Sequence, residues 1–156
     1  MMTGMERIDQ HILALLARDG RMSYTDLGRE TGLSTSAAQQ RVRRLEQRGV
    51  ITGFHADVDP AALGRTLTAF ISIRPHDAGD DEHTTRVLAG MPEVVSCFSV
   101  AGDSSYLCMV IVGSTGELDA LLTRVRTQAN AATVTTVVLT TIFRDRPLVV
   151  APDAVD

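Results

Sequence analysis

The side chains best suited to chemistry are gathered in one short stretch, residues 34–49. Hydroxyl, amide and guanidinium groups recur there with the spacing of one helix face. Gln can pair with adenine and Arg with guanine through two hydrogen bonds each, while hydroxyls and the amides of a helix N-terminus hold phosphate. This chemistry is typical of a helix that enters the major groove of double-stranded DNA. The candidate DNA-binding residues are Ser34, Thr35, Ser36, Gln39, Gln40, Arg41, Arg43 and Arg44.

The residues around this stretch predict two short helices joined by a tight turn. Ser23 and Asp26 form a capping box at the start of the first helix, and Gly32 ends it. Ser34 caps the second helix, which ends at Gly49. This order is that of a helix-turn-helix, although a polar helix face can also be merely solvated. The apolar face of the second helix consists of Ala38, Val42 and Leu45.

An amphipathic helix over residues 6–17 is expected to cover these two helices. Residues 50–54 then leave as an extended segment. Pro60 and its neighbours have the composition of a connector. The sequence therefore predicts a DNA-binding domain over residues 1–52 and a connector over residues 53–64.

Charge is divided unevenly along the 156 residues. The net charge is −4, yet residues 1–55 hold eight Arg against six Asp and Glu, whereas residues 56–156 hold seven Arg against thirteen. Positive charge is thus concentrated where DNA is expected to bind. No apolar run of about eighteen residues and no secretion signal occur, which predicts a cytoplasmic protein.

Residues 65–147 predict an α+β domain with the order β-α-β-β-α-β, followed by a tail over residues 148–156. The strands are expected at residues 67–73, 94–101, 106–112 and 133–143, and the helices at residues 82–89 and after Ser114. The usual solution is an antiparallel sheet with both helices on one face. Because the strand at 106–112 is apolar on both sides, the bare face needs a partner. A second copy of the chain is the simplest one, which predicts a homodimer.

The two cysteines, Cys97 and Cys108, fall in predicted strands. Two Cys without CxxC or His-rich spacing predict buried free thiols, with redox sensing as the alternative.

The whole of residues 7–147 resembles the Lrp/AsnC family, the feast/famine regulators of bacteria and archaea. The resemblance is carried by the runs LS-x-S-A, RVRRLE, G-V-I and A-x-V-D-P. It implies a winged helix-turn-helix followed by a ferredoxin-like effector domain. It also implies dimers that assemble further, into tetramers or octamers, and an amino-acid effector held between dimers beside the loop that joins the second and third strands.

That loop departs from the family pattern. Family members typically show Gly-x-x-Asp followed by an aromatic residue, whereas this chain has Ser105 in the carboxylate position. Either Asp103 replaces that carboxylate, or the effector differs, or the loop is an ordinary polar hairpin tip. The resemblance also suggests that two threonines of the last strand close the pocket from a neighbouring subunit. The candidate effector-binding residues are Gly102, Asp103, Ser104, Ser105, Tyr106, Thr135 and Thr136.

Two other functions are compatible with parts of the sequence. A metal-dependent enzyme could use the polar group His76, Asp80, Asp81, Glu82 and His83. That reading is the weaker one, because no pair of nucleophile and base accompanies the group, so neither catalysis nor a cofactor is expected. An architectural protein that binds DNA without an effector is the remaining alternative.

Overall fold

The computed structural model describes residues 5–77 and 81–148 as two separate units. Of the described residues, the first unit contains 5–57 together with 143–148, and the second contains 58–77 and 81–142. The first division falls inside the predicted connector. Among the described residues, none of the helices combines the length and the apolar character that a membrane crossing requires.

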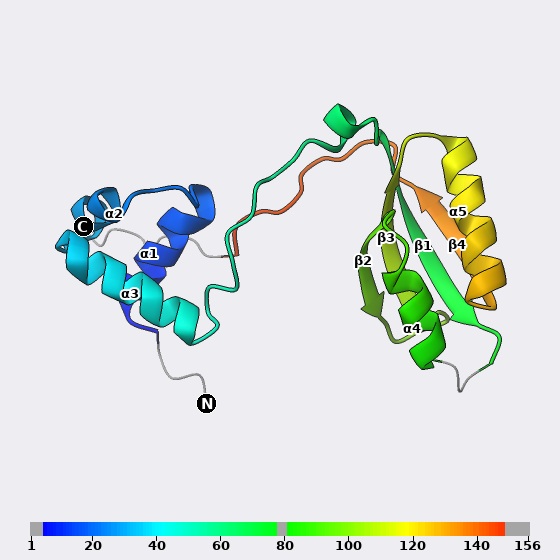
Figure 1. Ribbon diagram of the computed structural model, residues 1–156, viewed down its shortest axis with the longest axis horizontal. Coiled ribbons are helices and arrows are strands. Elements are labelled where there is room, and N and C mark those ends of the chain that lie inside the picture. The colour runs from blue at the N-terminus through cyan, green and yellow to red at the C-terminus, as the bar shows by residue number, and fades with distance from the viewer. Residues whose placement is uncertain (1–4, 78–80, 149–156) are drawn as a thin grey trace. The chain divides into compact units, whose positions relative to one another are not determined.

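The first unit is built from three helices, α1 (Arg7–Arg18), α2 (Tyr24–Thr31) and α3 (Thr35–Gln47) (Figure 1). The predicted capping residues lie at the start of α2, at its end and at the start of α3. The Ser23 hydroxyl accepts the N–H of Asp26 at 3.1 Å. Gly32 follows with φ of 70°, a left-handed conformation that glycine adopts without steric cost. The Ser34 hydroxyl then accepts the N–H of Ala37 at 3.2 Å, so α3 begins at once.

One small apolar core holds these helices together. Its fully buried members come from all three helices, and Leu33 and Ile51 pack against its edge. The segment after α3, which would supply the wing of a winged helix-turn-helix, pairs with no strand in the described part of this unit. The buried members are Ile12, Leu27, Ala38, Val42 and Leu45.

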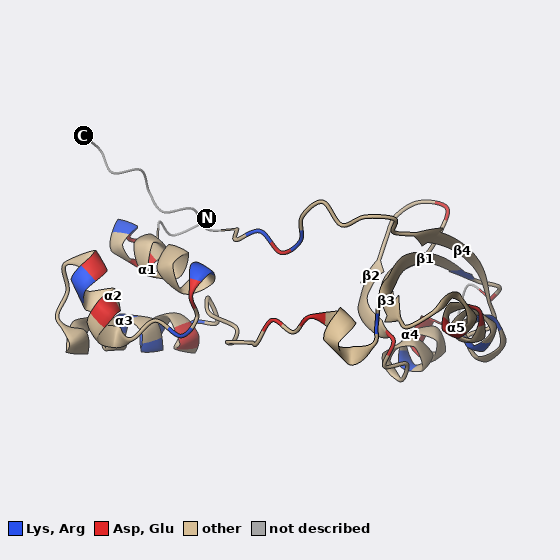
Figure 2. Ribbon diagram, turned by 90° about the horizontal axis from the view of Figure 1, so that it is seen from above, with Lys and Arg blue, Asp and Glu red and all other residues tan. Residues whose placement is uncertain are grey.

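The second unit has the predicted β-α-β-β-α-β order. Its four strands form one antiparallel sheet in the order β2-β3-β1-β4. Both long helices lie on the same face of that sheet (Figure 2). The α+β class and the helix-turn-helix are therefore confirmed. The elements are a 3-10 turn η1 (Pro60–Leu63), β1 (Leu67–Pro75), α4 (Asp81–Ala89), β2 (Val94–Ser99), β3 (Tyr106–Val112), α5 (Thr115–Gln128) and β4 (Ala131–Val137).

Alternation along β1 separates a buried face from an open face. Ala69, Ile71 and Ile73 are fully buried beneath α4 and α5, whereas Phe70 points to the other side and is 37% exposed. The open face continues across the sheet, because Phe70 pairs with Met109 and Ser72 pairs with Leu107. The other exposed apolar residues of this face are Phe98 and Val134.

The last strand is shorter than the sequence predicts, ending at Val137 instead of residue 143. β4 pairs only with β1, and β1 begins at Leu67. The N–H of Val138 donates to the Thr68 carbonyl at 2.9 Å, next to the first residue of β1. Among the described residues, the chain beyond Val138 pairs with no other strand. The apolar residues that suggested a longer strand, Leu139 and Ile142, are exposed.

Candidate functional site

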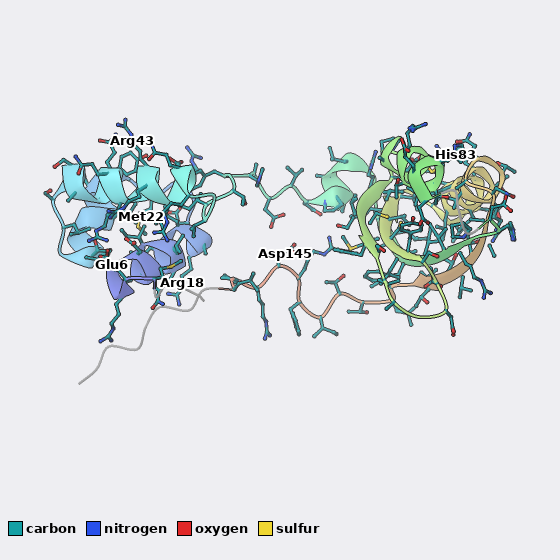
Figure 3. The ribbon with its side chains drawn as sticks, turned by 90° about the horizontal axis from the view of Figure 1, so that it is seen from below. Glu6, Arg18, Met22, Arg43, His83 and Asp145 are labelled. Carbon is teal, nitrogen blue, oxygen red and sulfur yellow. The ribbon has the colours of Figure 1, made fainter. Side chains whose placement is uncertain are left out.

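Helix α3 presents a polar face opposite its buried one. Ser36, Gln40, Arg43 and Arg44 are exposed, whereas Gln39 is half-buried. Arg43 points away from α1 and α2 (Figure 3). Within the described residues, neither Arg43 nor Arg44 forms an ion pair, so both guanidinium groups keep their donors for another molecule.

The start of α3 adds hydroxyl groups to the same surface. Ser34 and Ser36 lie 3.2 Å apart at their hydroxyl oxygens, and Thr35 donates to the Thr25 hydroxyl of α2 at 3.4 Å. All three hydroxyls are on exposed residues beside the free amides of the helix N-terminus. This end of the helix can therefore hold a backbone phosphate while Gln40 and the Arg side chains face the bases.

Arg41 differs from its neighbours because its guanidinium is engaged within the protein. Its Nη1 donates to the carboxylates of Asp9, at 2.7 Å, and Glu6, at 2.8 Å, both from the start of α1. These hydrogen bonds, with Asp9 the stronger influence, raise the pKa of Arg41. The Asp9 side chain is only 3% exposed. Arg41 therefore fastens α3 to α1, a role that the sequence pattern does not reveal.

In the described part of the helical unit, α2 carries charges of both signs, whereas α3 carries a net positive charge. The outer side of α2 carries both signs, because Arg29 pairs with Asp26 at 2.6 Å. Along α3 the Arg residues outnumber Glu46 (Figure 2). A phosphate backbone that approaches α3 would thus meet two exposed guanidinium groups, Arg43 and Arg44, that no carboxylate of the described residues pairs with.

The candidate effector loop comprises residues 100–105, between β2 and β3. The N–H of Val100 donates to the Ser105 carbonyl at 3.0 Å, and the N–H of Ser105 donates to Ile73 of β1, also at 3.0 Å. Gly102 has a φ of 146°, which favours glycine. Among the described residues, no acceptor takes the N–H of Gly102, Asp103 or Ser104. The tip thus offers free amides, and the exposed Asp103 offers a carboxylate.

Tyr106, the first residue of β3, directly follows the loop and is buried beneath it. Its ring is buried in the helix-covered core, and its hydroxyl donates to the Asp81 carboxylate at 2.8 Å. Burial, reinforced by that hydrogen bond, raises the pKa of Tyr106 to about 12. Tyr106 therefore supports the base of the loop from inside the unit.

Thr135 and Thr136 lie on opposite faces of β4. Thr135 pairs with the buried Ile71 and faces the helices, whereas Thr136 pairs with Phe70 and is exposed on the open face. β4 and β2 are opposite edges of the sheet. The structure therefore does not bring the two threonines and the loop tip together within one chain.

The residues of the metal alternative are engaged separately. Glu82 pairs with Arg86 at 2.6 Å, His83 lies 2.8 Å from the Gln128 carbonyl through Nε2, and Asp81 accepts from Tyr106. Asp80 lies outside the described residues. In the ranges 5–77 and 81–148, no three His, Cys, Asp or Glu side chains are grouped as metal ligands.

Two family models match the chain in succession. Residues 5–46 match the AsnC-type helix-turn-helix domain, and residues 68–148 match the Lrp/AsnC ligand-binding domain. The two matches cover α2 and α3 in one unit and the whole sheet in the other.

Individual proteins match over nearly the full length. The HTH-type transcriptional regulator LrpA of Mycobacterium tuberculosis is 43% identical, with 94% of this chain and 97% of that protein covered. The leucine-responsive regulatory protein of Salmonella typhimurium is 36% identical over 66% of this chain and 64% of that protein. A solved structure of the feast or famine regulatory protein from M. tuberculosis complexed with L-methionine superimposes with a TM-score of 0.89 at 42% identity, covering 94% of this chain and 99% of that one.

Proposed function

Because the chain belongs to the Lrp/AsnC family of transcriptional regulators, we propose that it binds specific DNA sites through α3 and responds to a small amino acid bound beside residues 100–105. The chain is a transcriptional regulator and not an enzyme. The observation that carries the DNA-binding role is the exposed face of α3. There Gln40, Arg43 and Arg44 lie opposite a buried apolar face, with no ion pair within the described residues to occupy the guanidinium groups. A regulator of this kind acts on the chromosome, in the cytoplasm.

The test of the DNA interface uses single substitutions that remove one cation at a time. Arg43→Ala and Arg44→Ala should each weaken operator binding and reduce the slope of log affinity against log salt by about one, because each removes one phosphate-neutralising charge. Arg86→Ala is the control, since Arg86 is also exposed but lies on α4 of the other unit. Unchanged affinity and slope in both α3 variants would show that this face does not bind DNA.

The loop supports an amino-acid effector through its chemistry. Free amides at Gly102, Asp103 and Ser104 can hold a carboxylate, and the Asp103 carboxylate can hold an ammonium group. A solved structure of a protein 42% identical to this one is complexed with L-methionine. We therefore take a zwitterionic amino acid as the effector class, with Asp103 in place of the carboxylate that Ser105 lacks.

The open face of the sheet supports a homodimer. Phe70, Phe98 and Val134 are 37%, 56% and 69% exposed in the single chain, and Met109 lies between them half-buried. A second copy can cover this apolar surface through the same patch on both subunits. Further association of dimers, to tetramers or octamers, would bring a neighbouring subunit's β4 to the loop, so that Thr136 could reach an effector that it cannot reach within one chain.

Isothermal titration with a panel of amino acids that includes L-methionine tests the effector site. Asp103→Ala should weaken the binding of any amino acid that the parent protein binds, and Ser105→Asp should strengthen it. DNA affinity should then change with that amino acid by about 5–150-fold. If neither substitution alters affinity, the effector site lies elsewhere. DNA binding that no amino acid alters would instead indicate the architectural role.

A further inference from the structure

The two cysteines face each other across the β2–β3 hairpin. Cys97 of β2 is the direct partner of Cys108 of β3, and their sulfur atoms are 3.2 Å apart. The side chain of Cys97 is exposed, whereas Cys108 is fully buried in the sheet core. One thiol is thus open to reagents in solution, and the other touches only the first thiol and the core.

The hydrogen-bond pattern shows that the pair occupies the closer type of cross-strand site. The N–H of Val100 donates to Ser105, which makes that pair a hydrogen-bonded one. Pair types alternate along an antiparallel ladder, so Cys97 and Cys108, three pairs further, form a non-hydrogen-bonded pair. Cα atoms of such pairs lie about 4.5 Å apart, which is within the range that a disulfide can bridge.

The surroundings of the pair admit a small oxidant. A cavity of about 340 Å³ opens beside Cys97 between β2 and α4, with Leu88 and Tyr106 in its lining. Cys97 lies on the helix-covered side at the edge strand, so covering the open sheet face with a second subunit leaves it accessible. The Cys108 thiol donates a hydrogen bond to the Cys97 sulfur, where negative charge must form for attack. Burial raises the pKa of Cys108, which keeps that thiol protonated as the donor.

We infer that Cys97 and Cys108 form a peroxide-responsive dithiol that closes a disulfide across the β2–β3 hairpin. Cys97, as the thiolate, attacks one oxygen of hydrogen peroxide, forming a sulfenic acid and releasing the other oxygen as water. The Cys108 sulfur then displaces that hydroxyl as a second water and forms the disulfide. In total, two thiols lose two hydrogen atoms while one peroxide becomes two waters. Two equivalents of a small thiol reduce the disulfide by exchange, returning both cysteines to thiols and forming the small thiol's own disulfide.

The disulfide would close around the candidate effector loop. Residues 100–105 lie entirely between the two cysteines, so the bond holds both arms of the hairpin at the base of that loop. Oxidation would therefore restrict the same amides that are proposed to hold the amino-acid carboxylate. This regulatory consequence rests on the proposed function, whereas formation of the disulfide does not.

Mass spectrometry of the full-length protein tests the chemistry. The reduced chain is treated with a slight excess of hydrogen peroxide and then with an alkylating agent. The parent should lose two hydrogen atoms and take up no alkyl group. No Arg or Lys lies between residues 87 and 123, so trypsin leaves both cysteines on one peptide. Chymotryptic cleavage at Phe98 and Tyr106 separates them, and a disulfide should keep the fragments joined until a thiol reductant is added.

Three variants make this result specific. Cys108→Ser should leave Cys97 as a sulfenic acid that a cyclic dione traps. Cys97→Ser should leave the buried Cys108 unreacted. The matched control combines Cys97→Ser with Ser99→Cys, which keeps an exposed thiol on the same face but opposite Tyr106. Its Cα lies about 7–8 Å from that of Cys108, too far for a disulfide. Peroxide that leaves the parent thiols free, or joins only separate chains, would overturn the inference.

The regulatory part is tested by titrating reduced and oxidised protein with the amino acid that the reduced form binds. The dissociation constant should differ by about 5-fold or more between the two forms of the parent and should stay equal in the control variant. A disulfide that forms without changing this constant would refute the link to the loop. Absence of any amino-acid binding by the reduced protein would instead refute the proposed effector function.

Discussion

Arg41 and Arg43 are two positions apart on α3 and yet have different surroundings. Arg43 is exposed, whereas the side chain of Arg41 is 22% exposed and is bonded to Asp9 and Glu6. The helical period turns Arg43 toward solvent and Arg41 toward α1. Residue type and spacing place both among the candidates for DNA contact, and only the carboxylates of α1 distinguish them.

Arg41→Ala should destabilise the helical unit by about 2–4 kcal/mol, because it leaves the buried Asp9 carboxylate without its partner. Guanidinium denaturation followed by the circular dichroism of the helices measures this loss. The double variant Arg41→Ala with Asp9→Ala should recover part of the stability, since the only carboxylate then left without Arg41 is that of Glu6, which is 61% exposed. A single variant as stable as the parent would show that the ion pair does not hold α3 in place.

Tyr106 makes the stability of the second unit fall at high pH. Its pKa is 10.0 in the absence of the fold and about 12 within it. A raised pKa means that the folded state favours the neutral phenol. The contribution of Tyr106 is therefore complete below about pH 10 and is lost as the pH rises from about 10 to 12.

Ultraviolet titration of tyrosinate absorbance can measure this pKa directly. The chain has two tyrosines, so Tyr24→Phe leaves Tyr106 as the only one. Its absorbance midpoint should fall near pH 12, with circular dichroism recorded at each pH to verify that the chain is folded. A midpoint near pH 10 would contradict the burial and the bond to Asp81.

At the scale of the elements, the angle between α2 and α3 depends on a close approach at Gly28. The N–H of Leu33 donates to the Gly28 carbonyl at 2.8 Å. A Cβ at position 28 would lie 2.6 Å from the Leu33 carbonyl oxygen and 3.3 Å from the Ser34 carbonyl carbon. Both are backbone atoms of the turn, which cannot move aside without shifting the start of α3.

Gly28→Ala should therefore destabilise the helical unit by about 1–3 kcal/mol, despite the gain of up to about 1 kcal/mol in helix propensity. DNA affinity should fall as well, because α3 is displaced. Gly116→Ala is the matched control, since its Cβ would meet only the Ser114 hydroxyl oxygen at 3.8 Å. Thermal unfolding of both variants measures the change in stability. A Gly28 variant more stable than the parent would show that the turn relaxes freely.

At the scale of the whole molecule, the open sheet face is the proposed dimer interface. Phe98→Asp should convert the proposed dimer to monomers without unfolding the chain, because Phe98 is 56% exposed in the single subunit and a charge there is costly only when covered. Mass measurement in solution at micromolar concentration reads the outcome. Thr123→Asp places the same charge on the exposed side of α5 and should leave the dimer intact. A dimer that survives Phe98→Asp would place the interface on another surface.

The proposed dimer also predicts the form of the operator. Two copies of α3 related by a two-fold axis require inverted half-sites about one DNA turn apart, or a multiple of it. A footprint that covers one isolated half-site would contradict the paired arrangement.

The sequence by itself determined the local elements and the family. Caps at Ser23 and Ser34, the left-handed Gly32 and the two-residue alternation of β1 are interactions between near neighbours, so their pattern is visible along the chain. The order of strands and helices then allowed few folds. The run of motifs from the first helix to the last strand allowed one family.

Tertiary structure alone decided how distant side chains meet. The bond between Arg41 and Asp9, the contact between Tyr106 and Asp81 and the pairing of Cys97 with Cys108 join residues 32, 25 and 11 positions apart. The end of β4 depends on where β1 begins, and the register between β1 and β4 decides which of Thr135 and Thr136 faces the helices. Such contacts follow from packing in three dimensions, and no local spacing encodes them.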